Sequence, residues 1–77
     1  MRAKVYVTLK AGVHDPAGKA VMGGLQNLGY SEVRDVRIGK FFEMDVEDGP
    51  NVEGRLREMC EKLLANTVIE RFRVELG

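Results

Sequence analysis

Hydrophobic and polar residues alternate along two short stretches of this chain, one near each end. In residues 3–10, Val5, Val7 and Leu9 fall on one side and polar residues on the other, which predicts a strand with one buried face. The stretch 68–76 has the same alternation. Its inward positions are Phe72, Val74 and Leu76. Each end of the chain therefore contributes one half-buried strand.

The central stretch, residues 33–46, is also rich in β-forming residues but is interrupted by Gly39-Lys40. We interpret it as two strands joined by a hairpin turn. Val36 and Ile38 must share the core face with Phe42, and a two-residue turn would instead place Phe41 opposite Ile38. We therefore expect a three-residue connection or a bulge beside Gly39.

Two stretches between these strands have apolar residues at helical spacing. Asp15-Pro16 is typical of a helix start, and Gly29 is typical of its end. We interpret Gly24 as a close approach of this helix to its neighbour, and Asn51 as the cap of the second helix. The apolar positions of the two helices are Ala17, Val21, Gly24, Leu25 and Leu28, then Val52, Leu56, Met59, Cys60, Leu63 and Leu64.

The predicted order, β-α-β-β-α-β, is typical of a ferredoxin-like α+β domain. In that fold two helices cover one face of a four-stranded antiparallel sheet, and the other face is left open. An open face with two aromatic residues and mixed charges suits a protein partner better than water. Its expected members are Tyr6, Thr8, Asp35, Arg37, Phe41, Glu43, Arg71 and Arg73.

Length, cysteine count and net charge exclude several classes of protein. Residues 1–77 form one small domain, whose core alone gives marginal stability. A single cysteine cannot form an internal disulfide, and net charge +0, from 12 basic and 12 acidic residues, argues against nucleic-acid binding. No apolar run is long enough to span a bilayer, and no cleavable signal peptide is evident. We expect an intracellular protein stabilised by partner chains.

No group of residues predicts catalysis. Cys60 falls on the apolar stripe of the second helix, which favours an inert buried thiol over a nucleophile. His14 has no serine or cysteine nearby to activate; its role stays open. Gly39-Lys40 lacks the glycine-rich spacing of a phosphate loop and joins two strands. We expect no catalytic, cofactor or metal site in this chain.

Several segments of the sequence, in the same order and at the same spacing, resemble the PurS family, the small subunit of phosphoribosylformylglycinamidine (FGAM) synthase. The resemblance covers nearly the whole chain, with His14 and Gly23-Gly24 as modest departures. The matching segments are Lys4-Val5-Tyr6-Val7-Thr8-Leu9-Lys10, Asp15-Pro16-Ala17-Gly18-Lys19-Ala20-Val21, Leu28-Gly29-Tyr30, Asp35-Val36-Arg37-Ile38-Gly39-Lys40 with Glu43, Met59-Cys60-Glu61-Lys62-Leu63-Leu64-Ala65-Asn66, and Val68-Ile69-Glu70.

The resemblance implies a cytoplasmic, non-catalytic subunit in the fourth step of purine biosynthesis. There an ATP-dependent synthetase subunit, using magnesium, converts formylglycinamide ribonucleotide (FGAR) to FGAM with ammonia that a glutaminase subunit releases from glutamine. The small subunit is implied to be a dimer that bridges the two and assists ammonia transfer. We expect Tyr6, Arg37, Lys40, Phe41 and Glu43 to contribute to interfaces. An alternative is a ferredoxin-like regulatory module that binds a small molecule at a dimer seam.

Overall fold

Three strands and two helices make up the computed structural model, which describes residues 1–77. They follow the order β1 (Arg2–Leu9), α1 (Pro16–Asn27), β2 (Gly39–Asp45), α2 (Val52–Met59) and β3 (Glu70–Leu76), and a π-helical segment, Cys60–Leu64, prolongs α2. The hydrophobic pattern predicted β1, β3 and the two helical stretches to within two residues at their ends, whereas β2 begins at Gly39, where a turn was predicted. The expected additional strand over residues 33–38 is absent.

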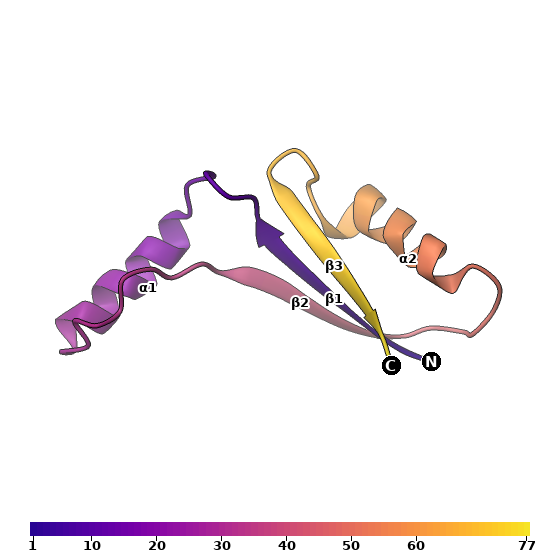
Figure 1. Cartoon of the computed structure of the whole chain (residues 1–77), viewed down its shortest axis with the longest axis horizontal. Coiled ribbons are helices and arrows are strands. Elements are labelled where there is room, and N and C mark those ends of the chain that lie inside the picture. The colour runs from indigo at the N-terminus through magenta and orange to yellow at the C-terminus, as the bar shows by residue number, and fades with distance from the viewer.

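The strands form one antiparallel sheet in the order β2-β1-β3. In its register Val5 lies between Phe42 and Val74, and Val7 lies between Lys40 and Phe72. Val5 and Val7 are fully buried, and Leu56 and Cys60 of the second helical stretch are buried with them. The predicted inward residues of β1 thus form the core, and α2 packs beside β3 (Figure 1).

The predicted hairpin at Gly39-Lys40 is wrong, because the chain does not turn there. Gly39 begins β2 and pairs with Thr8, and its φ is not positive. A Cβ at Gly39 would lie 2.4 Å from the carbonyl oxygen of Val7. Glycine at this position therefore permits close approach of two strands rather than a reversal of the chain. The sheet has three strands, not four.

The helix α1 does not lie on the sheet, so the predicted placement of both helices on one face is also wrong. Residues 33–38 run in line with β2 and carry α1 beyond the end of the sheet (Figure 1). The radius of gyration is 15.8 Å, whereas a compact chain of this length has about 11 Å. Val21 and Leu28 of α1 are exposed. The chain is therefore elongated, and α1 lacks the packing partner that its apolar stripe predicts.

The ends of α1 agree with the sequence. Asp15 caps its N-terminus by accepting a hydrogen bond from the Gly18 backbone N–H (2.8 Å). Gly29 follows the helix with a φ of +103°, a value that favours glycine. Two expectations fail: Asn51 precedes α2 without a side-chain cap bond, and Gly24 has no neighbour within 4 Å of an added Cβ.

Candidate interaction surfaces

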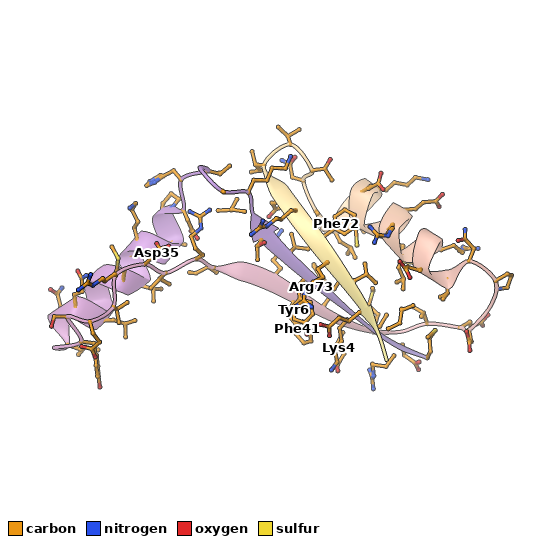
Figure 2. All side chains as sticks on the ribbon, viewed as in Figure 1. Lys4, Tyr6, Asp35, Phe41, Phe72 and Arg73 are labelled. Atoms are coloured by element: carbon orange, nitrogen blue, oxygen red, sulfur yellow. The ribbon has the colours of Figure 1, made fainter.

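The open face of the sheet carries an aromatic and arginine cluster. Tyr6 and Phe41 are cross-strand neighbours, with ring centroids 5.1 Å apart. The guanidinium carbon of Arg73 lies 4.2 Å from the centroid of the Tyr6 ring and forms an ion pair with Glu75. In Figure 2 the labelled side chains of Lys4, Tyr6, Phe41 and Arg73 lie together on the sheet. We call Tyr6, Phe41 and Arg73 the aromatic cluster.

This cluster is suited to binding rather than to catalysis. Phe41 is 54% exposed, and an arginine stacked on a tyrosine is a common component of protein interfaces. The Tyr6 hydroxyl donates a long hydrogen bond to Glu75 (3.4 Å). The flanking cross-strand pair, Lys4 and Glu43, has opposite charges. The surface therefore combines exposed apolar area with both signs of charge.

The five predicted interface residues divide among three places. Tyr6, Phe41 and Glu43 share the open face, as the alternation predicted. Lys40 lies opposite Val7, hence on the helix-covered face, where its Nζ is 3.9 Å from Glu70. Arg37 lies in residues 33–38, the segment before β2 that we call the link. Its guanidinium donates a hydrogen bond to the Lys10 carbonyl (3.2 Å). Their role in interfaces stays a prediction.

Two expected members of the open face lie outside the sheet. Asp35 and Arg37 belong to the link, and Figure 2 places Asp35 beside α1, away from Tyr6. The prediction assumed a strand over residues 33–38 that the structure does not contain. Asp35 and Arg37 instead line a cleft of about 270 Å³ with His14 and Asp15. No group of three metal-ligating side chains forms there or elsewhere.

Asp15 joins α1 to the link. Its two carboxylate oxygens accept hydrogen bonds from the backbone N–H groups of Ile38 and Gly18, both at 2.8 Å. These bonds lower the pKa of Asp15, and its side chain is buried. The Asp-Pro pair signalled the cap, but nothing in the local sequence signalled the bond from Ile38. That contact fixes the direction in which the link leaves α1.

Gly18 provides a second contact between α1 and the link. A Cβ there would lie 2.2 Å from the carbonyl oxygen of Val36, so the link passes directly against the helix. Gln26 adds a hydrogen bond from its side-chain amide to the Val33 carbonyl (2.9 Å). We call α1 together with residues 28–38 the arm. These contacts make the arm a single unit.

Cys60 is buried at the junction of α2 and its π-helical extension. Burial raises the pKa of its thiol, which lowers the fraction present as reactive thiolate at neutral pH. Its neighbours in the core are Val5, Val7 and Ala65. The structure therefore agrees with the interpretation of Cys60 as a packing residue.

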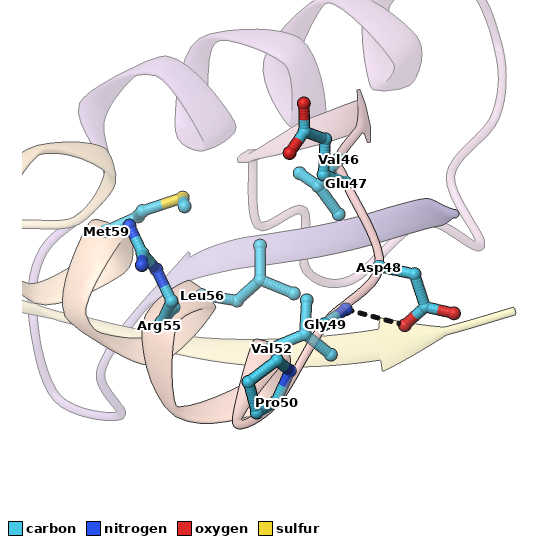
Figure 3. A pocket seen from close by; sticks show the side chains of 9 residues that line it. All are labelled: Val46, Glu47, Asp48, Gly49, Pro50, Val52, Arg55, Leu56 and Met59. Atoms are coloured by element: carbon cyan, nitrogen blue, oxygen red, sulfur yellow. Dashed lines mark hydrogen bonds between the residues drawn. The ribbon is translucent and has the colours of Figure 1, made fainter.

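A hollow of about 390 Å³ lies where β2 leads into α2 (Figure 3). Apolar side chains, among them Val46, Leu56 and Met59, form much of its wall. In its wall the Gly49 N–H donates a hydrogen bond to the Asp48 carboxylate (3.0 Å). No buried polar side-chain atom in the chain lacks a hydrogen-bond partner, so no buried unpaired group marks the hollow as a ligand site. No helix is long and apolar enough to cross a membrane.

The fold and these surfaces define a small, elongated α+β protein whose exposed features are aromatic, charged and apolar surfaces. The model of the PurS family, described as phosphoribosylformylglycinamidine (FGAM) synthase, matches residues 2–77. The chain belongs to the PurS family.

Individual relatives support this assignment to the PurS family. The PurS subunit of phosphoribosylformylglycinamidine synthase from Bacillus subtilis is 51% identical over 76 residues, covering 97% of this chain and 90% of that protein. The PurS subunit from Archaeoglobus fulgidus is 43% identical over 76 residues, covering 96% of this chain and 95% of that protein.

Solved structures agree as well. B. subtilis PurS superposes with a TM-score of 0.90 at 52% identity, covering 96% of this chain and 94% of that one. A chain of PurLQS from Thermotoga maritima superposes with a TM-score of 0.83 at 25% identity, covering 96% of this chain and 93% of that one. The overall shape, including the elongated arrangement, is therefore shared with solved members of the family.

Proposed function

We propose that this chain is a non-catalytic subunit of FGAM synthase, the glutamine-dependent ligase that converts FGAR to FGAM in purine biosynthesis. In this role it bridges the synthetase and glutaminase subunits and assists ammonia transfer between them. The supporting observation is the full-length match to PurS subunits, at 51% identity over nearly the whole of both chains for the B. subtilis protein. The structural match to a chain of PurLQS agrees with membership of a larger complex.

The structure supports a role through contacts. Eight of the 77 residues are buried, and the exposed apolar residues include Phe41, Val21 and Leu28. Exposed apolar area of this extent is typical of a protein that functions in an assembly. We propose that the assembly contains two copies of this chain, that it is cytoplasmic, and that the other subunits bind its ATP and magnesium.

Reconstitution tests this function. The purified synthetase and glutaminase subunits are assayed for FGAM formation with and without this chain, using either glutamine or ammonium chloride as nitrogen source. We expect omission to abolish most glutamine-dependent turnover and to leave ammonia-dependent turnover much less affected. Unchanged glutamine-dependent turnover after omission would contradict the proposal.

A further inference from the structure

Charge is unevenly distributed along the open face of the sheet. Near the start of β1, Lys4 lies between Glu43 and Glu75, so charges of both signs neighbour each other there. Near the end of β1, Thr8 has Arg71 on one side and a glycine on the other. No carboxylate belongs to this second row of residues. The open face is therefore basic at the end where β1 finishes and β3 begins.

Arg71 has no carboxylate partner within the chain. It takes part in no ion pair, and its Nε donates a long hydrogen bond to the Thr8 hydroxyl (3.4 Å). Glu70, its neighbour in sequence, lies instead 3.9 Å from the Lys40 Nζ on the helix-covered face. A guanidinium has five N–H donors and favours carboxylates. The Arg71 side chain is therefore free to bind a carboxylate of another molecule.

A cleft of about 460 Å³ lies beside Arg71. Tyr6 and Arg73 of the aromatic cluster contribute to its wall, and Figure 2 shows their side chains close to that of Phe41. Arginine and aromatic residues are the types most enriched in protein interfaces. The cleft therefore suits a protein segment that carries an acidic side chain.

The cleft lies beside a free edge of the sheet, because β3 is an outer strand. The Gly77 N–H donates to the Arg2 carbonyl (3.2 Å), so odd-numbered residues of β3 direct their backbone groups toward β1. Phe72 and Val74 therefore direct theirs toward the outer edge. Neither of these two N–H groups donates to a loop carbonyl or to a side chain of this chain. They remain available to another strand.

The β3 edge lacks most of the features that protect sheet edges from pairing. The strand has seven residues and no proline, and its register with β1 is continuous, without a bulge. Val68 and Ile69, just before it, are exposed apolar residues. The protection that the edge does have is the positive charge of Arg71 and Arg73, which disfavours strands without complementary charge. A regular edge of this kind is a template for an added strand.

We propose that an extended segment of another subunit of the complex adds to the outer edge of β3 as a further strand and places a carboxylate against Arg71. The inference rests on the proposed function, which supplies the other subunits, and specifies where and by what chemistry one of them binds. Backbone bonds to Phe72 and Val74 hold the segment. Since side chains alternate along a strand, every second residue of the segment faces the open side, where the acidic residue meets Arg71.

Charge reversal at Arg71 gives the first test. The affinity of the chain for a mixture of the synthetase and glutaminase subunits is measured by biolayer interferometry. We expect Arg71→Glu to bind about tenfold more weakly and Arg71→Lys, which keeps the charge, to lose much less. Arg71 is exposed, so all variants should fold, and thermal melts check this. Equal losses in Arg71→Lys and Arg71→Glu would overturn the charge attraction.

Arg57→Glu is the matched control, because it makes the same change of charge at an exposed arginine of α2. We expect its affinity for the other subunits to stay close to that of the wild type. Raising the salt concentration should weaken wild-type binding more than binding of Arg71→Glu. A loss in Arg57→Glu as large as that in Arg71→Glu would show a response to overall charge and overturn the site.

Hydrogen exchange tests the added strand. In the chain alone, the edge-facing amides of Phe72 and Val74 should exchange quickly, because they have no acceptor. We expect peptides from residues 69–77 to gain protection at these amides when the wild-type chain is bound to the other subunits, as measured by mass spectrometry. Unchanged exchange over residues 69–77 of a bound chain would overturn the addition of a strand to β3.

The remaining outcomes separate this inference from the proposed function. A wild-type chain that binds neither subunit would contradict the proposed function, and the inference with it. If the wild-type chain supports glutamine-dependent turnover and Arg71→Glu binds equally well, the inference alone is overturned. Arg71→Glu should leave the mass of the isolated chain unchanged. A smaller mass than that of the wild type would assign the edge to a contact between copies, which also overturns the inference.

Discussion

At the scale of single residues, Asp15 is the side chain on which most local structure depends. It caps α1 and holds the link through Ile38, so one carboxylate fixes the relative placement of two segments. Both bonds favour its charged form, which is why its pKa falls below the usual value near 3.8. A group whose pKa is lowered on folding stabilises the fold above its ordinary pKa and loses that contribution as the pH falls through the lowered value.

We predict that Asp15→Asn lowers the melting temperature at pH 7, because the amide is a weaker acceptor and carries no charge. The difference from wild type should shrink as the pH falls below about 4, where Asp15 of the unfolded chain takes up a proton, and should be smallest once the pH is below the lowered pKa of the folded chain. Thermal melts between pH 2 and 7 measure this. Asp48→Asn is the control, since Asp48 is exposed and bonds only its neighbour Gly49. An unchanged difference across the whole pH range would contradict this account of Asp15.

Cys60 gives a second prediction at the same scale. Because its side chain is fully buried in the core, Cys60→Ala should cost about 1 kcal/mol of unfolding free energy. Glutamine-dependent turnover of the reconstituted complex should be unchanged at temperatures where the variant is folded. A large loss of turnover in a folded variant would show that the thiol takes part in chemistry.

At the scale of elements, local sequence signals predicted β1 and the start of α1 correctly, but they did not predict the role of Gly39. The alternation of β1 and the Asp-Pro start of α1 are local signals, and the structure confirms both. The reason for Gly39 is non-local, since it lies against the Val7 carbonyl of another strand. In sequence such a glycine resembles a turn residue, and the hairpin, the fourth strand and the positions of Asp35 and Arg37 were all misplaced for this one reason. Tyr6, Phe41 and Glu43 depended only on alternation and were placed correctly.

Two glycines of α1 test the contact between helix and link. At Gly24 an added Cβ meets nothing within 4 Å, so Gly24→Ala should raise the unfolding free energy by about 0.5–1 kcal/mol through helix propensity. At Gly18 the same Cβ would lie 2.2 Å from the Val36 carbonyl oxygen, so Gly18→Ala should lower it by about 1–3 kcal/mol. Urea unfolding of both variants at one protein concentration measures the pair. Equal effects of the two substitutions would contradict the packing of the link on α1.

At the scale of the whole molecule, the chain is a small core with a projecting arm. Its principal extents are 50 × 25 × 14 Å, and its buried hydrophobic residues cluster around β1 and the second helical stretch. A chain of this length can form only a small hydrophobic core. Even so, α1 contributes almost no side chains to that core. The structure is therefore that of a part of an assembly, in agreement with the PurS family to which the chain belongs.

The mass of the chain in solution, alone and mixed with the synthetase and glutaminase subunits, tests this account most directly. Light scattering coupled to size-exclusion chromatography measures it across a range of concentrations. We expect about twice the chain mass of 8.6 kDa for the chain alone, and one larger complex containing all three proteins for the mixture. A monomer that passes through the column separately from both subunits would contradict the account.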